Sequence, residues 1–298
     1  MNTPLATRDG VAPSCVSLPA GTWPTMLDFL LQRFAAIPKE EWLRRMTALE
    51  VVDEFGGQLT PERRYQAHVR LYYYRSVAHE PRIPFGEVLL FQDEHLVVAD
   101  KPHFLPVTAG GRFVQEVLQV RLKRRLKIDT LQPIHRIDRE TAGVVVFCVQ
   151  PPERDAYHAL FRQHVVQKNY QAIAPWRAEL KFPQTRHSRI VQGEPFFRQC
   201  EAPGAPNALS EIELLQVQGE RARYRLVPHT GQKHQLRVHM AALGLALEND
   251  PFYPDVRRGQ NEHDDWTRPL QLLAKSIAFV DPVTGQARHF ESPRELRL

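Results

Sequence analysis

One stretch, PIHRIDRETAGVVVFCV at residues 133–149, restricts the possible folds more than any other part of the chain. Its second half, from Gly143 onward, is a β-branched apolar run that is typical of a buried strand. Its first half places five ionisable side chains within the six residues 135–140. Charges at the start of a core strand must be paired, hydrated or functional, because burying them alone is costly. The stretch therefore predicts a fold with buried β-strands and a candidate site where one of them begins.

The composition sets broad limits on fold class and partners. A length of 298 residues fits one large domain or a domain with an appendage, and 24 prolines against 15 glycines argue against an all-helical chain. The net charge of +5 suggests a polyanionic partner, although charge alone does not decide for nucleic acid. Cys15, Cys148 and Cys200 are odd in number and widely spaced, so we expect free thiols in a reducing cytoplasm. No apolar run approaches the ~18 residues of a membrane span, and we expect no membrane partner.

The order of segments predicts two folded parts. Residues 1–18 lack the apolar core of a signal peptide and are interpreted as a flexible tail. Residues 19–76 contain two amphipathic helical patterns, a glycine turn and a strand, which together indicate a small domain. Residues 77–86 hold two prolines within four residues and are the predicted linker to the main body, residues 87–298.

The main body consists mostly of predicted strands. Two segments have the apolar spacing of helices, RDAYHALFRQHVV at 154–166 and QKHQLRVHMAALG at 232–244. The second ends at Gly244, a residue type that commonly terminates helices. A majority of strands with few helices predicts an α+β fold built on a mixed, mainly antiparallel sheet.

Polar residues gather against apolar strands in three separated segments: HRIDRETAG (135–143), KNYQAIA (168–174) and HTGQKHQLRVH (229–239). In these segments, and in DEHLVVADKP at 93–102, the chain resembles the RluA-type pseudouridine synthases, which isomerise uridine to pseudouridine in structured RNA. The family's His-Arg-Leu-Asp signature stands here as His135-Arg136-Ile137-Asp138, and its Thr-Gly-Arg-x-His-Gln-Ile/Leu-Arg-Val-His signature stands as 230–239. The resemblance covers about residues 85–298 and implies an isomerase that needs no metal and no organic cofactor.

The resemblance also implies three catalytic residues. Asp138 matches the catalytic aspartate, because a carboxylate can act as nucleophile or base in breaking and remaking the bond between uracil and ribose. Whether it attacks the sugar, attacks the ring or abstracts a ribose proton stays open, and the alternative is that it caps a turn or pairs with Arg136 or Arg139. Arg237 matches the arginine that pairs with this carboxylate, with a phosphate contact as the alternative. Tyr170 matches the tyrosine that packs on the uracil, with a place in the core as the alternative.

Several cationic residues are candidate RNA contacts. By resemblance, Arg136 occupies the space of the extruded base or holds its phosphate, and a surface salt bridge is the alternative. His135 is expected to orient the loop by hydrogen bonding. We assign Lys168 and Lys233 to RNA binding because they lie inside matched motifs. The segment RLKRRLK is either a solvated helix face or, as we favour, a patch for the RNA backbone formed by Arg121, Lys123, Arg124, Arg125 and Lys127.

Other features limit alternative functions. His229, His234 and His239 recur every five residues, but that spacing turns a helix by roughly 500° between neighbours, so we expect no metal site. A catalytically silent RNA-binding or ribosome-assembly factor of the same fold is the rival hypothesis. The matched Asp, Tyr and Arg are all present, which favours an enzyme. We expect a monomer acting on large-subunit ribosomal RNA or, as second choice, transfer RNA.

The N-terminal unit, residues 19–76, resembles an S4-type RNA-binding domain. Two departures from family patterns affect substrate binding more than chemistry. Met26 stands where the first S4 helix usually begins with a basic residue, and EVVDEFGG replaces the usual Val-x-Val-Asn-Gly turn. In the main body Ala142 replaces a small polar residue, and Asn249 replaces the first glycine of a Gly-Asp-x-x-Tyr-Gly segment that shapes a wall of the cleft.

Overall fold

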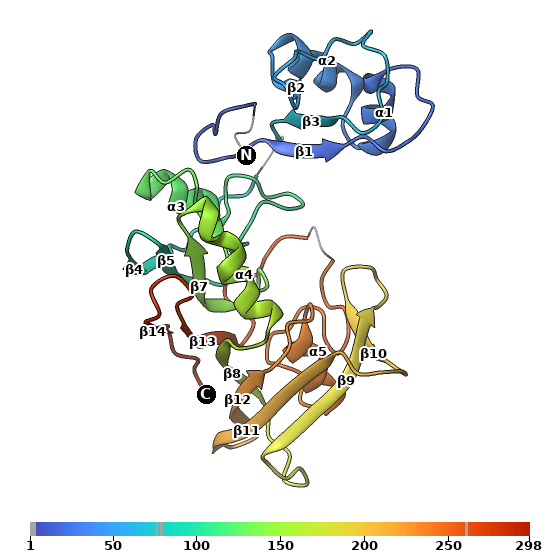
Figure 1. Cartoon of the computed structure of the whole chain (residues 1–298). Helices are drawn as coiled ribbons and strands as arrows, with labels where there is room; N and C mark the ends of the chain where they lie inside the picture. Colours follow the sequence, from blue (N-terminus) through green and yellow to red (C-terminus); the bar gives the residue numbers. More distant parts are fainter. Residues whose placement is uncertain (1–3, 76, 78–79, 260–261) are drawn as a thin grey trace. The chain divides into compact units, whose positions relative to one another are not determined.

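The computed structural model describes residues 4–75, 77, 80–259 and 262–298. Contacts divide the chain into a smaller unit, residues 1–80 with 123–129, and a larger unit, residues 81–122 with 130–298 (Figure 1). Parts of the predicted tail (1–3), small domain (76) and linker (78–79) lie outside the described residues. No helix in the described ranges is both long enough and apolar enough to cross a membrane.

The smaller unit combines two helices with a small antiparallel sheet. The helices α1 (Met26–Arg33) and α2 (Lys39–Thr47) lie where the amphipathic patterns predict them. A capping box between Thr25 and Asp28 starts α1 by satisfying free backbone donors. The strands β2 (Val51–Asp53) and β3 (Arg70–Tyr73) pair antiparallel. Apolar side chains from both helices and both strands pack together into one core.

One strand of the smaller unit lies inside the predicted flexible tail. The strand β1 (Ser14–Ser17) pairs antiparallel with β3, with Cys15 opposite Tyr72, and gives the sheet order β1-β3-β2. The ordered part of the chain therefore begins earlier than the predicted boundary at residue 18. Only four residues long and alternating between half-buried and exposed positions, β1 is too short for periodicity to detect.

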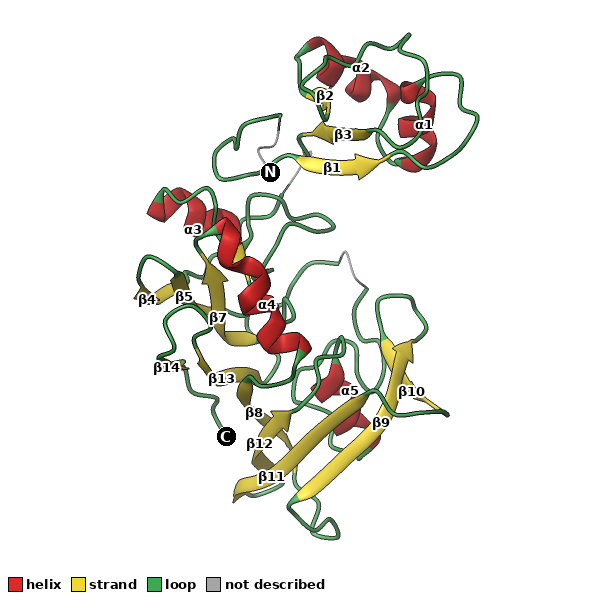
Figure 2. Ribbon diagram, in the orientation of Figure 1, coloured by secondary structure: helices red, strands yellow, loops and turns green. Residues whose placement is uncertain are grey.

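The larger unit is built on an 11-stranded sheet, counted over the described residues (Figure 2). Its main path runs β10-β9-β11-β12-β8-β13-β7-β5-β4, with β14 beside β13 and β6 beside β7. All pairings are antiparallel except the parallel pair of β13 and β7, which confirms the predicted mixed, mainly antiparallel α+β class. The strands are β4 (Val88–Gln92), β5 (Leu96–Lys101), β6 (Gln132–Pro133), β7 (Ala142–Cys148), β8 (Gln167–Pro175), β9 (Gln184–Gln192), β10 (Gln199–Ala202), β11 (Ala208–Gln218), β12 (Arg221–Pro228), β13 (Leu272–Val280) and β14 (Ala287–Glu291).

Two helices of the larger unit confirm the helical patterns of the main body. The helix α4 (Arg154–Arg162) follows a 3₁₀ turn (Pro151–Glu153), and its Tyr157 packs into the core beside β5 and β7. The helix α5 (Gln235–Ala242) is buried along its first six residues. Gly244 follows it with φ +73°, the left-handed conformation that lets a chain leave a helix.

The strand β7 is the buried strand that the sequence predicts, and every residue in it is buried. Gly143 adopts φ +117°, and a Cβ there would lie 2.2 Å from the carbonyl oxygen of Ala274 on β13. Glycine is therefore required for the close parallel pairing of β7 and β13. The charged residues 135–140 lie directly before this strand, so the fold places them at the N-terminal end of an inner strand of the sheet.

The basic segment 121–127 is only partly available at the surface. The helix α3 (Leu118–Leu126) contains its first part. Arg121 pairs with Glu116 and with Glu87 at 3.4 Å, and it donates to backbone carbonyls of residues 83 and 85. Lys123 is buried, at 5% exposure. Arg121 and Lys123 therefore do not face an RNA backbone, whereas Arg125 and Lys127 are exposed and Arg124 is partly exposed.

Candidate active site

A cavity of about 760 Å³ opens beside the start of β7. Lining residues come from four sequence-distant segments of the larger unit, within 106–108, 134–141, 161–170 and 228–237, and from Leu272 on β13. Seven residues that the sequence marks as site candidates are among its lining residues: His135, Arg136, Asp138, Lys168, Tyr170, Lys233 and Arg237. The fold thus brings together all the candidates except those of the basic segment 121–127.

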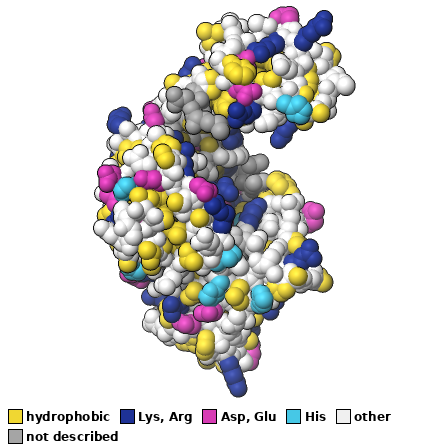
Figure 3. Space-filling view, in the orientation of Figure 1, with side chains coloured by type: hydrophobic (Ala, Val, Ile, Leu, Met, Phe, Trp, Pro, Cys, Tyr) yellow, Lys and Arg dark blue, Asp and Glu magenta, His cyan; other side chains and the backbone are white. Residues whose placement is uncertain are grey.

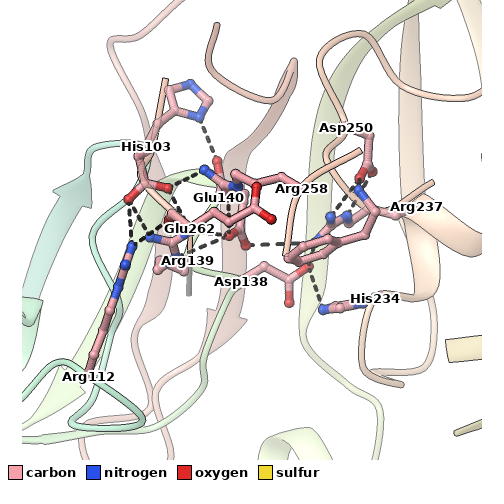
Figure 4. Close-up of polar contacts among 12 residues, drawn as sticks. His103, Arg112, Asp138, Arg139, Glu140, His234, Arg237, Asp250, Arg258 and Glu262 are labelled. Carbon is pink, nitrogen blue, oxygen red and sulfur yellow. Dashed lines mark hydrogen bonds and ion pairs between the residues drawn. The ribbon is translucent and has the colours of Figure 1, made fainter. Parts of the chain in front are cut away.

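Asp138 lies in the turn between β6 and β7. Its carbonyl oxygen accepts a hydrogen bond from the backbone N–H of Thr141 at 3.2 Å, which closes the turn before the strand. Its side chain is 23% exposed, and Oδ2 accepts a hydrogen bond from Nη1 of Arg237 at 3.1 Å (Figure 4). One oxygen of the carboxylate is therefore held by a cation while the group stays open to the cavity.

Arg237, on α5, is almost fully buried, with 1% of its side chain exposed. Its Nε and Nη2 donate to the two oxygens of Asp250 at 2.8 and 2.7 Å, a two-pronged pair that only the planar guanidinium can make. Burial alone would lower the pKa of Arg237, but Asp250, Asp138 and Glu140 raise it above its ordinary value. The guanidinium is thus permanently charged and fixed in orientation, and it presents Nη1 to Asp138 as a fixed hydrogen-bond donor.

The start of α5 is held by hydrogen bonds within the second signature. His234 adopts φ +55°, outside the helical region, and turns the chain into the helix. The side-chain oxygen of Gln235 accepts hydrogen bonds from the hydroxyl of Thr230 at 2.7 Å and from the backbone N–H of Gln232 at 3.0 Å. These contacts fix the turn that precedes α5, and with it the position of Arg237.

Tyr170 and Lys168 reach the cavity from β8. Burial and the nearby charge of Asp138 raise the pKa of Tyr170, so its ring presents a neutral phenol beside the carboxylate. The ammonium of Lys168 donates to the carbonyl of Thr230 at 3.0 Å, and burial lowers its pKa to about 8. An aromatic face beside a carboxylate suits a planar uracil, because stacking on such a face contributes ~1–3 kcal/mol per base.

The remaining cavity candidates are one partly buried residue and two exposed residues. Nε2 of His135 accepts a hydrogen bond from the backbone N–H of Val146 at 3.1 Å, and burial lowers the pKa of the ring to about 3. His135 is therefore neutral and ties the turn to β7. Arg136 and Lys233 are exposed at the cavity. Among the described residues neither has a carboxylate partner, which speaks against the salt-bridge alternative for Arg136.

Three charged residues around Asp138 were missed by sequence reasoning. Asp250 is fully buried and accepts hydrogen bonds from Nε and Nη2 of Arg237. Glu140 lies 3.8 Å from Nη1 of Arg237; burial would raise its pKa, but Arg139 and Arg237 lower it to about 2. Lys101 is fully buried and donates to three backbone carbonyls, including that of Arg139 at 3.1 Å, and burial lowers its pKa to about 7. Each of the three lies in or beside a motif described in the sequence analysis, so those motifs were the sequence feature that could have indicated them.

The three regularly spaced histidines point to different partners. His229 pairs with Glu211 at 2.9 Å, Nδ1 of His234 contacts the hydroxyl of Tyr253 at 2.9 Å, and His239 contacts two serine hydroxyls. Within the described ranges, no group of three or more His, Cys, Asp or Glu side chains could hold a metal ion. The histidines act as local hydrogen-bonding residues.

Known proteins provide the following comparisons. Residues 95–242 match the family model described as RNA pseudouridylate synthase. The chain is 31% identical over 216 residues to tRNA pseudouridine synthase C of Yersinia pestis, covering 67% of this chain and 83% of that relative. It is 26% identical over 218 residues to ribosomal large subunit pseudouridine synthase C of Salmonella typhi, covering 72% of this chain and 68% of that relative.

A solved structure extends the comparison to the fold. Human RNA pseudouridylate synthase domain containing 1 superimposes with a TM-score of 0.58 at 20% identity, covering 72% of this chain and 86% of that one. At this identity the likeness concerns the fold alone.

Proposed function

The chain belongs to the RNA pseudouridine synthase family, and we propose that it acts on ribosomal or transfer RNA with Asp138 as the catalytic carboxylate. It is an isomerase, which detaches uracil from its ribose and rejoins it through carbon. The observation that carries the proposal for Asp138 is its geometry. Arg237 holds the carboxylate at 3.1 Å, in a cavity that Tyr170 also lines.

The proposed division of roles follows from the position of each side chain. Asp138 supplies the nucleophile or base, and Arg237 keeps it oriented. Tyr170 packs on the uracil. A base inside folded RNA is unreachable, so it must be extruded at a cost of a few kcal/mol. The exposed guanidinium of Arg136 is suited to hold the extruded nucleotide or its phosphate, and Lys168 and Lys233 to contact the backbone nearby.

The rival hypothesis of a catalytically silent RNA-binding factor accounts less well for the site. A silent factor has no need of an aspartate that is partly open to a cavity and held by a buried arginine. The arginine pair costs desolvation energy, and a protein that only binds RNA could place apolar residues there at no loss. Retention of this pair therefore supports catalysis.

The names of the relatives guide the substrate proposal. The name of one relative refers to the large ribosomal subunit, and the name of another refers to tRNA. We favour large-subunit ribosomal RNA first and transfer RNA second, in the cytoplasm and with the protein as a monomer.

The function and its substrate are tested by mapping pseudouridines in total RNA from cells with and without this protein. We expect one or a few sites in large-subunit ribosomal RNA to lose modification, and to regain it when the wild-type gene is supplied. Loss only in transfer RNA would select the second choice. An identical map in the two strains would contradict the proposed activity in those RNAs.

The basic surface is suited to the RNA backbone in several places. In Figure 3, Lys and Arg side chains form several separate groups on this face rather than one continuous patch. The exposed residues Arg125 and Lys127, with the partly exposed Arg124, are the part of segment 121–127 that we propose for phosphate contacts.

We propose further that the smaller unit is an S4-like RNA-binding domain. Two helices followed by a strand and a turn at Gly56 support this assignment. Met26 is fully buried in its core and therefore makes no RNA contact, consistent with altered contacts in this chain. Lys39 and Arg64 are exposed and, among the described residues, have no carboxylate partner, so they are available to phosphates.

Charge reversal at Lys39 and Arg64 should weaken RNA binding. The double variant Lys39→Glu, Arg64→Glu should lower affinity and flatten the dependence of affinity on salt, because fewer counterions are released. The rate at saturating enzyme should stay at the wild-type value. The matched control reverses Arg177 and Lys181, two exposed residues between β8 and β9. Equal affinity and equal salt slope for wild type and the first variant would remove the smaller unit from the RNA contact surface.

A further inference from the structure

Asp264 is a buried carboxylate that three arginines share, and it lies outside every motif that the sequence singled out. Its side chain is 2% exposed. Its oxygens accept hydrogen bonds from Arg139 at 2.8 and 2.9 Å, from Arg112 at 3.3 Å and from Arg258. A carboxylate so enclosed by guanidinium groups is firmly placed, because each of them donates a hydrogen bond to it.

Four ion pairs in series connect Asp264 to the catalytic carboxylate, and Figure 4 labels the other members of the series, Arg139, Glu140, Arg237 and Asp138. Arg139, held by Asp264, donates through Nε and Nη2 to Oε1 of Glu140 at 3.1 and 2.8 Å. The other oxygen of Glu140 lies 3.8 Å from Nη1 of Arg237. The same Nη1 donates to Asp138 at 3.1 Å.

Nη1 of Arg237 is therefore shared between two carboxylates. Asp138 holds the nearer position, and Glu140 stays at the longer distance while Arg139 retains its first oxygen. Arg258 lies 3.6 Å from that same oxygen of Glu140, so two guanidinium groups lie beside it. Asp264 contacts both of them, Arg139 and Arg258.

We propose that Asp264 is a positioning residue for the reaction, which acts through Arg139, Glu140 and Arg237 to keep Asp138 oriented toward the cavity. The inference rests on the proposed role of Asp138. Without the charge of Asp264, Arg139 and Arg258 would keep only Glu140 as a shared carboxylate. Glu140 would move, and Arg237 would change its contact with Asp138.

A purely structural role would be to anchor the segment 262–268, and the structure offers a separate anchor for it. The ring of Trp266 packs edge-on against Phe104 at 5.1 Å and against Phe85 at 5.6 Å between centroids. This aromatic contact does not involve the charge of Asp264. The segment should therefore stay docked when that charge is removed.

The kinetic test uses the full-length protein with Asp264→Asn, which keeps shape and removes charge. We expect the single-turnover rate at saturating enzyme to fall roughly 10- to 100-fold, since small displacements of reacting groups cost that much, while RNA affinity stays near wild type. Asp264→Glu should recover part of the rate. The control Asp265→Asn should keep the wild-type rate, because the Asp265 carboxylate is exposed and caps its own turn at Thr267.

A double variant tests the route. If Asp264 acts through Arg139, then Arg139→Gln combined with Asp264→Asn should be no slower than Arg139→Gln alone, because coupled sites are not additive. Multiplied losses would contradict the route. A wild-type rate for Asp264→Asn accompanied by a lower melting temperature would reduce Asp264 to a structural anchor.

A measurement without activity separates this inference from the proposed function. The ¹⁵Nε–H signal of Arg237, assigned by its absence in Arg237→Lys, should shift in Asp264→Asn and not in Asp265→Asn. An unmoved signal would overturn the coupling even in an active enzyme. A shifted signal in a protein that modifies no RNA would instead count against the proposed function and leave the coupling supported.

Discussion

Replacing Asp138 by Asn should reduce pseudouridine formation below detection while RNA affinity stays within a few fold of wild type. The amide has the shape of the acid but cannot serve as nucleophile or base. Arg237 keeps its two-pronged pair with Asp250, so the variant does not leave the guanidinium without a carboxylate. The fold and the RNA-binding surface should consequently persist, and the loss should be confined to chemistry.

The measurement is single-turnover conversion of the mapped RNA, with affinity measured in parallel on the same preparation. Asp255→Asn is the matched control, because Asp255 is exposed, does not line the cavity and lies outside the ion-pair network around Asp138. Mass spectrometry should exclude deamidation of the introduced amide, which would regenerate the acid. Substantial turnover by the intact Asp138→Asn variant would contradict the catalytic role of Asp138.

The parts of the fold that follow local patterns were predictable from the sequence. The buried strand β7 follows from its β-branched run, and α1, α4 and α5 follow from apolar residues at helical spacing. The candidates Asp138, Tyr170 and Arg237 came from motifs, and the fold places them around one cavity.

The ion-pair partner Asp264 was not predictable, because it stands in a loop outside the motifs and only the folded chain brings it to Arg139. Asp250 follows Asn249 in a matched segment, but the motif does not show that it pairs with Arg237. For Arg121, the charge alone suggested an RNA contact. The sequence does not show that the carboxylate of Glu116 pairs with this arginine in the folded chain.

Changing Arg237 to Met should slow the reaction strongly. Met fills similar space but leaves Asp138, Glu140 and Asp250 without their shared cation. Breaking one side of a buried pair typically costs ~3–5 kcal/mol. Without the guanidinium, Asp138 also loses the donor that holds its Oδ2 at 3.1 Å, so its carboxylate is no longer fixed toward the cavity.

Stability of the Met variant should also depend on pH. In the wild type, burial would raise the pKa of Glu140, but Arg139 and Arg237 lower it to about 2. This pKa lies below that of an unfolded glutamate, so ionised Glu140 contributes stability that is present at neutral pH and lost as pH falls. Removing Arg237 takes away one of the two cations, so this contribution becomes smaller. The melting temperature of the Met variant should therefore lie furthest below wild type at neutral pH, and the difference should shrink as pH falls.

Arg237→Lys provides the matched comparison for charge without shape. Its ammonium restores the cation but cannot bind both oxygens of Asp250 and reach Asp138 with the same fork. The rate should be intermediate between wild type and the Met variant. If Arg237 only held a phosphate, the Met variant would instead lose affinity, show a shallower salt slope and keep the wild-type rate at saturating enzyme. Single-turnover rates, salt slopes and thermal unfolding across pH separate these outcomes, and a wild-type single-turnover rate in the Met variant would contradict the role of the Arg237–Asp138 contact in the reaction.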